Sequence, residues 1–277
     1  MTEGTVLAIG QAFAALYGVV GGSFLAAAIV RLPEDRSLLV PSSCPRCGHR
    51  IGARDLVPVL SWLALRGRCR HCAARIPPLY PLVEALTGVL AWLTFRHVFG
   101  AVADLDLAHA VAWVSQLTFL SLILVAAATD IKHRIIPHET SIYAAPIGIA
   151  LHGLLQVLGY QGFFAVGFVP SVLGAAMWGG GFALIAWLWV VVRGHVGLGG
   201  GDVRLALMYG AFLGPHGALW ALCLGSIVGS VVGLIALPFV GARGYLPFGP
   251  SLALGGVAYT LFGDLPVAEW LADFLYG

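Results

Sequence analysis

The first residues that could do chemistry are four cysteines in two Cys-x-x-Cys pairs. They are Cys44, Cys47, Cys69 and Cys72. Four thiolates with this spacing can bind one tetrahedral Zn²⁺, and a zinc ion held by four thiolates has no open position for water. The pattern therefore predicts a structural zinc site rather than a catalytic one. Two disulfides are the alternative, and a reducing compartment would disfavour them.

Three acidic residues within or beside apolar runs form a second group: Glu84, Asp130 and Asp202. A charged side chain at membrane depth is costly, so each of them is a candidate functional residue. Two carboxylates that lie close together share one proton, and such a pair can act on a peptide bond as general base and general acid. If Asp130 and Asp202 meet in space, the sequence predicts an aspartyl protease site.

Asp202 directly follows a run of glycines, which are Gly199, Gly200 and Gly201. Glycine has no Cβ, so a backbone of this kind can come close to an extended peptide. We therefore expect these glycines to form a loop of the active site.

Spacing alone leaves other roles open for the acids. Asp202 could cap a helix that begins at the next residue, and Asp130 could be a polar helix end balanced by nearby basic residues. An ion-coupled transporter could use both aspartates to bind its ion, and a membrane protein with a zinc segment could be a non-catalytic scaffold. For Glu84, a side chain that reaches to the membrane surface is the simpler account.

The composition shows which elements must position these residues. Of 277 residues, 59% are hydrophobic and 10% are charged, and the mean hydropathy is +0.91, whereas soluble domains carry about 25% charged residues. Apolar runs of about 17–25 residues can each cross a bilayer as a helix. Such runs lie near 6–30, 79–98, 109–130, 141–160, 171–193, 203–214, 217–239 and 247–263, the sixth being short. We therefore predict an all-α polytopic membrane protein with about eight transmembrane helices, embedded in a lipid bilayer and without a nucleic-acid partner.

Basic residues are concentrated between the first two runs. Nine of the fifteen Lys and Arg residues lie there, and basic residues near membrane spans stay on the cytoplasmic side. We therefore predict a first transmembrane helix at 1–30, a small cytoplasmic zinc-knuckle insert with four cysteine ligands at 31–78, and a transmembrane helical bundle at 79–277 that carries the protease site. Alternation of the spans then places Asp130 and Asp202 at cytoplasmic helix ends, where they can face each other.

Six segments occur in an order that is typical of one family. They are GSFLAAAIVRLP (22–33), RGRCRHC (66–72) with the paired cysteines, YPLVEALTG (80–88), TDIKHRIIP (129–137), GGGDVRLAL (199–207) and LPFGPSLALG (246–255). In these segments the chain resembles the bacterial type IV prepilin peptidases, and the resemblance covers nearly the whole sequence.

The resemblance implies a GxGD-type aspartyl endopeptidase with Asp130 and Asp202 as catalytic residues and the Gly-x-Gly step at Gly199 and Gly201. Such enzymes remove the leader peptide from type IV prepilins or pseudopilins at the cytoplasmic face of the bacterial inner membrane. Many also methylate the new N-terminus with S-adenosyl-L-methionine. Components of pilus or type II secretion assembly are further partners that it implies. Glu84 is our candidate for the methyl-transfer site.

The chain departs from the family's usual residues at four positions. Ala26 and Leu56 replace asparagines in the N-terminal region that is associated with methylation. His138 stands where the family has Asp or Asn, and Arg204 stands where it has Lys. Both aspartates of the predicted protease site are present, so these departures leave the peptidase expectation unchanged.

Overall fold

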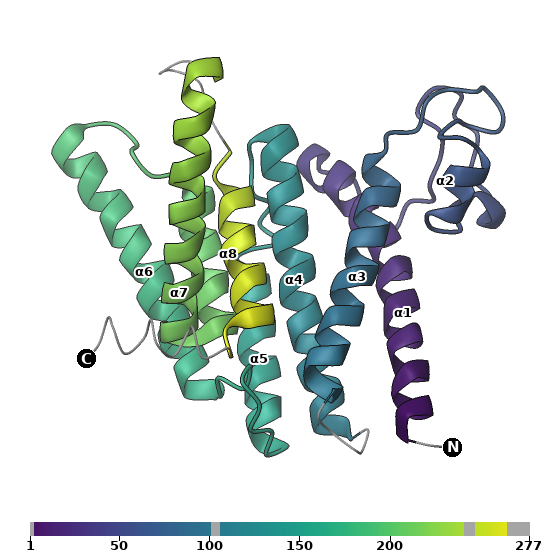
Figure 1. Ribbon diagram of the computed structural model, residues 1–277. Coiled ribbons are helices and arrows are strands. Elements are labelled where there is room, and N and C mark those ends of the chain that lie inside the picture. Colours follow the sequence, from purple (N-terminus) through teal and green to yellow (C-terminus); the bar gives the residue numbers. More distant parts are fainter. Residues whose placement is uncertain (1–2, 101–105, 241–246, 265–277) are drawn as a thin grey trace. The chain divides into compact units, whose positions relative to one another are not determined.

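A computed structural model describes residues 3–100, 106–240 and 247–264 of the chain (Figure 1). Within these ranges the regular elements are helices, and β pairing is limited to two isolated bridges in the cysteine insert. The chain divides into two compact units, Met1–Ala103 and Asp104–Gly277. The predicted all-α class is therefore confirmed for the described residues.

The first unit contains two long helices and three short ones. They are α1 (Glu3–Arg31), the 3-10 helices η1 (Leu32–Glu34) and η2 (Ala53–Leu56), α2 (Leu60–Ala64) and α3 (Leu79–Phe99). The long helices α1 and α3 pack along each other, and the cysteine insert lies between them in sequence. A Cβ on Gly18 of α1 would lie only 2.5 Å from the Cβ of Ala91. Such close approach at small residues is typical of helix packing in lipid.

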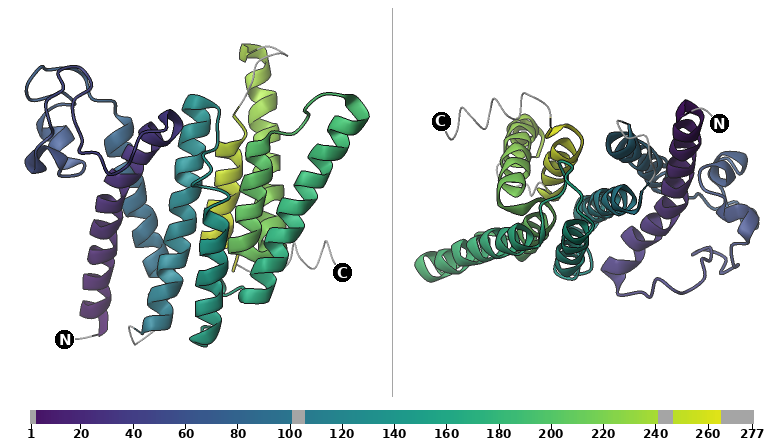
Figure 2. Two further views of the ribbon diagram at one scale, coloured as in Figure 1. Left: turned by 180° about the vertical axis from the view of Figure 1, so that it is seen from behind. Right: turned by 90° about the horizontal axis from the view of Figure 1, so that it is seen from below.

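The second unit contains five helices. They are α4 (Leu107–His133), α5 (Ala144–Val157), α6 (Phe168–Arg193), α7 (Gly200–Val240) and α8 (Gly249–Phe262). The buried ring of Phe119 on α4 packs against the rings of Tyr209 and Phe212 on α7, with centroids 5.3 and 5.4 Å away. Both views in Figure 2 show α8 side by side with α7. The Phe119 ring thus packs α4 against α7, and α8 packs against both of these helices.

The helix α7 is broken at Gly214, which has non-helical backbone angles (φ 67°, ψ −173°) and is followed by Pro215. Side chains of α6 bind carbonyl oxygens at the break: the Ser171 hydroxyl donates to Ala211 O, and the Trp178 ring N–H donates to Pro215 O at 2.8 Å. Backbone groups freed in a membrane must find such partners. The predicted spans 203–214 and 217–239 are therefore the two segments of α7.

Among the described residues, five helices are long and apolar enough to cross a membrane. They are Gly4–Glu34, Leu79–Phe99, Leu107–His133, Phe168–Arg193 and Gly200–Pro238. The predicted span at 141–160 is the shorter apolar helix α5, and the span at 247–263 is α8, which has 14 residues. The membrane class is confirmed, while the count of eight spans stays a prediction. Most of the predicted cytoplasmic loop at 240–246, including Arg243, lies outside the described residues.

Candidate catalytic and metal sites

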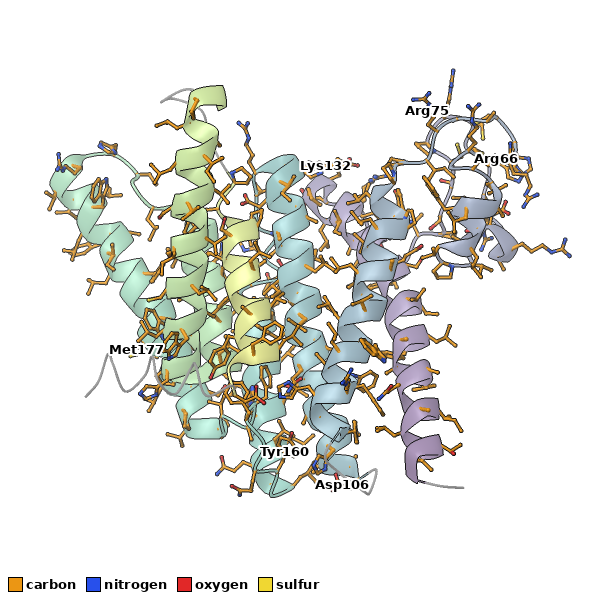
Figure 3. All side chains as sticks on the ribbon, viewed as in Figure 1. Arg66, Arg75, Asp106, Lys132, Tyr160 and Met177 are labelled. Carbon is orange, nitrogen blue, oxygen red and sulfur yellow. The ribbon has the colours of Figure 1, made fainter. Side chains whose placement is uncertain are left out.

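Asp130 lies in the last turn of α4 and is buried, with 4% of its surface exposed. Figure 3 labels Lys132 near this end of the helix and Asp106 at the other end. The Asp130 side chain has a fixed partner, because the backbone N–H of Gly249 donates a hydrogen bond to its Oδ2 at 2.8 Å. The sequence therefore predicted the helix end correctly, and the structure adds the contact that holds the carboxylate.

Asp202 lies in the first turn of α7, which begins at Gly200. The backbone N–H groups of Asp202 and Val203 both donate to Gly199 O, at 3.0 and 3.3 Å. The helix thus begins before Asp202 rather than after it. The alternative that Asp202 caps a helix starting at the next residue is therefore wrong.

The two aspartates lie within electrostatic range of each other in the second unit. Their carboxylates interact electrostatically, and the glycine turn packs on the segment after α4, since a Cβ on Gly201 would lie 3.1 Å from Ile136 Cδ1. Two neighbouring carboxylates can share one proton and so offer an acid and a base side by side. The arrangement can therefore perform acid–base chemistry on a peptide bond.

The three glycines differ in what surrounds them. A Cβ on Gly199 would lie 2.9 Å from Asp202 Oδ2, and one on Gly201 would meet Ile136 at 3.1–3.3 Å. A Cβ on Gly200 would meet no heavy atom within 4 Å. Space is thus tight at the first and third positions and open at the middle one, which agrees with the Gly-x-Gly pattern.

Arg204 bridges the glycine turn and the loop after α4. Its Nε donates to Gly200 O at 2.9 Å, and its Nη1 lies 2.8 and 2.9 Å from the two ring nitrogens of His138. A guanidinium only donates hydrogen bonds, so a ring nitrogen of His138 is the acceptor in this contact. Arg204 and His138 are two of the positions at which the chain departs from the prepilin peptidases that it resembles, and here they contact each other.

The four cysteines form one cluster in the first unit. The Sγ atoms of Cys44, Cys47, Cys69 and Cys72 all lie within 4.8 Å of one another, and none is in a disulfide. The two pairs fold alike: Gly48 N–H donates to Cys44 O and Ala73 N–H donates to Cys69 O, and both donors have positive φ. Four sulfurs at these distances fit a tetrahedral metal ion. The predicted cysteine cluster is therefore confirmed as a group that could bind a metal.

Local electrostatics favour a thiolate at Cys44, whereas at Cys72, against the effect of the backbone N–H of Ala74, burial and the neighbouring thiols raise the pKa of the thiol to about 11. The backbone N–H groups of Cys47 and Arg46 lower the pKa of the Cys44 thiol to about 6. Beside the cluster the rings of His49 and His71 lie on each other, with centroids 3.5 Å apart. The four sulfurs thus come together without a histidine ligand.

The insert is further tied by an ion pair between Asp55 and Arg70. Arg70 Nη2 lies 2.6 Å from Asp55 Oδ1, and its Nε also donates to the carboxylate. The hydrogen bond from this guanidinium holds the pKa of Asp55 below its usual range. The pair connects η2 to the second cysteine turn and so closes the fold of the insert. Figure 3 labels Arg66 and Arg75, two of its other arginines.

Glu84 is buried in α3, with 6% of its surface exposed. Its Oε2 accepts the backbone N–H of Val59 at 2.6 Å. Val59 has φ 59° and ψ −53°, and Leu60 N–H donates to Pro58 O at 2.6 Å, which defines a strained γ-turn. Glu84 therefore contacts the insert instead of reaching to the membrane surface.

Three contacts at these sites were not predicted: Gly249 with Asp130, Arg204 with His138, and Glu84 with Val59. Gly249 lies in one of the segments in which the chain resembles the prepilin peptidases, and Arg204 and His138 are two of its departures from that family. For Val59 the sequence carries no signal, because a β-branched residue rarely adopts positive φ.

Comparisons with known proteins agree with this geometry. The model of the Bacterial Peptidase A24 N-terminal domain matches residues 16–98, and the model of the Type IV leader peptidase family matches residues 117–234. The two matches lie in the first and second units respectively and define an integral membrane peptidase. No solved structure matches the chain.

Relatives named prepilin leader peptidase/N-methyltransferase are similar over most of the chain. The Myxococcus xanthus protein is 37% identical, with 85% of this chain and 66% of that protein covered. The Bacillus subtilis protein is 30% identical, with 92% and 96% covered, and the Aeromonas hydrophila protein is 34% identical, with 94% and 93% covered. The chain belongs to the type IV leader peptidase family, as its sequence motifs had predicted.

Proposed function

We propose that Asp130 and Asp202 are the catalytic pair with which this enzyme cuts the leader peptide. One observation carries the proposal: a buried aspartate at the end of α4 and an aspartate in the first turn of α7 lie within electrostatic range of each other in one compact unit. Because like charges so close together disfavour double ionisation, the pair provides one carboxylate and one carboxylic acid.

The reaction follows from this pair. The carboxylate takes a proton from a water molecule as its oxygen attacks the peptide carbonyl carbon, and the carboxylic acid protonates the carbonyl oxygen. When the intermediate collapses, the C–N bond breaks and the newly formed carboxylic acid donates its proton to the leaving amine. The other aspartate recovers a proton from the intermediate's hydroxyl group. Both side chains thereby return to their starting state.

The substrates that we propose are type IV prepilins or pseudopilins, cut at the cytoplasmic face of the bacterial inner membrane. The open space at Gly200, where a Cβ would meet no heavy atom within 4 Å, supports this proposal, because a backbone without a side chain there can come close to an extended peptide. Components of pilus or type II secretion assembly are the partners that would present such substrates.

We further propose that the cysteine cluster binds one structural Zn²⁺. Four thiolate ligands would complete its coordination, so the ion would hold the insert in shape without activating water. Bound zinc would also join the two cysteine turns, which are 21 residues apart in sequence.

For the methyl transfer we propose S-adenosyl-L-methionine as donor and Glu84 as a residue of the site. Next to Glu84, an open apolar cavity of about 500 Å³ extends along α1 and α3. It is lined by Ala15, Leu16, Val19, Val57, Pro58, Val59, Leu60, Ala85, Gly88, Val89 and Trp92. This lining does not fit the polar groups of the methyl donor.

The test of the catalytic pair is prepilin cleavage by Asp130→Asn and Asp202→Asn. Asparagine keeps the shape of the side chain but has no exchangeable carboxyl proton, so each variant should lose cleavage almost completely. The double variant should be little worse, since the two residues act as one unit. Asp106→Asn at the other end of α4 is the matched control, because asparagine caps a helix about as well as aspartate. Near-normal cleavage by either correctly inserted single variant would refute the pair.

A further inference from the structure

The N-terminus of α8 makes a buried contact with the proposed catalytic pair. The first backbone N–H groups of a helix have no acceptor within the helix. Here the N–H of Gly249, where α8 begins, donates to Asp130 Oδ2 at 2.8 Å across 119 residues of sequence. The contact is direct, so whatever moves Gly249 also moves the Asp130 carboxylate.

The fit around Gly249 leaves no space for a side chain. A Cβ on this residue would lie 2.8 Å from Asp130 Oδ2, 3.1 Å from its Cβ and 3.2 Å from its Cγ. All three distances are shorter than normal carbon contacts of about 3.5–4.0 Å. Any other residue must therefore push the carboxylate away from its present position.

The helix α8 is also fixed to α7, which carries Asp202. The hydroxyl of the fully buried Tyr209 donates to Leu252 O at 2.7 Å. Further along, the two backbones touch, since a Cβ on Gly225 of α7 would lie 2.7 Å from Leu252 Cα. The start of α8 is thus held by the helix of one aspartate while it binds the other.

We propose that Gly249 is a positioning residue that holds the Asp130 carboxylate in register with Asp202. Its N–H occupies Oδ2, which leaves Oδ1 as the oxygen that exchanges a proton with the attacking water or the leaving amine. The α7–α8 contacts set the position of this N–H and thereby the alignment of the pair. This inference rests on the proposed catalytic role of the two aspartates.

The experiment measures prepilin cleavage by the full-length Gly249→Ala variant. Because misplacing a catalytic group by about 1 Å can reduce a rate by roughly 100-fold, kcat should fall by about that factor while KM stays the same. Gly181→Ala is the control, since its added Cβ would meet no atom within 4 Å. A general folding defect would instead lower the amount of inserted protein and change KM as well.

Tyr209→Phe tests the same idea without adding any atom near the aspartates. It removes the hydroxyl that fixes α8 to α7, and kcat should fall by roughly three- to tenfold, the effect of one buried hydrogen bond. If Gly249→Ala inserts and cleaves like the wild type, the positioning role is wrong. Should Gly249→Ala fail to insert, an unchanged kcat in Tyr209→Phe would overturn it.

The outcomes also separate this inference from the proposed function. Loss of cleavage in Asp130→Asn together with normal kcat in Gly249→Ala would overturn the positioning role alone. Normal cleavage in Asp130→Asn would overturn the catalytic pair itself.

Discussion

Replacing Glu84 by glutamine or by alanine should separate its structural role from its proposed chemical role. Its Oε2 accepts the N–H of Val59, which is held in a strained γ-turn. Glutamine has a side-chain oxygen that can accept the same bond, whereas alanine has none. We therefore expect Glu84→Gln to keep the turn and Glu84→Ala to release it.

The expected magnitude follows from this contact. A fully buried donor that loses its only acceptor destabilises the folded state by about 1–3 kcal/mol, a factor of about 5–150 in an equilibrium, and the lower part of this range applies to Val59, which is partly buried. Glu84→Ala should raise the rate of hydrogen exchange at the Val59 amide by a factor in this range. In Glu84→Gln the exchange should stay close to that of the wild type.

The functional assay is mass analysis of prepilin after incubation with enzyme and methyl donor, which reports cleavage and methylation in one spectrum. Because Glu84 lies in the first unit and the aspartates lie in the second, Glu84→Gln should lose methylation and retain cleavage. Equal loss of both activities with normal Val59 exchange would refute the separation. Full retention of methylation would remove Glu84 from the proposed methyl-transfer site.

The remaining predictions concern metal, glycine and topology. Elemental analysis should find about one zinc per chain, and Cys44→Ser should lower the zinc content and unfold the insert; an ordered insert without zinc would contradict this. Gly201→Val should abolish cleavage because its side chain would meet Ile136, whereas Gly200→Ala should cleave normally; equal effects would show that space is not the reason. Reporter fusions after Arg36 and after Asp264 should lie on opposite sides of the membrane, and matching signals would exclude an even number of spans.

Much of the architecture was predictable because it depends on local properties of the sequence. The lengths of the apolar runs predicted the long helices, and the spacing of the cysteines predicted the cluster that includes Cys44 and Cys72. Asp130 and Asp202 could be placed at helix ends because the apolar runs stop or begin there.

The features that the sequence did not predict are contacts between segments that are far apart in the chain. The hydrogen bond from Gly249 to Asp130 requires α8 to begin at one particular height beside α4, and no local pattern specifies that height. The γ-turn at Val59 could not be predicted from local sequence either, because its N–H is bound by Glu84, which lies 25 residues away. The two predicted spans on either side of Gly214 do meet at a break, but the hydrogen bonds from α6 to the carbonyl oxygens at this break could not be predicted.

The break in α7 also determines how deep Asp202 lies in the bilayer. Twelve residues separate Asp202 from Gly214, a helical length of about 18 Å at 1.5 Å per residue, whereas the hydrocarbon layer is about 30 Å thick. If Gly214 lies at one edge of that layer, Asp202 lies roughly 12 Å inside the opposite edge. Hydrolysis consumes one water per cut, so water must descend this distance to the carboxylates. Water would then need a path from the membrane surface to the carboxylates, and the peptide bond to be cut would have to enter the same path.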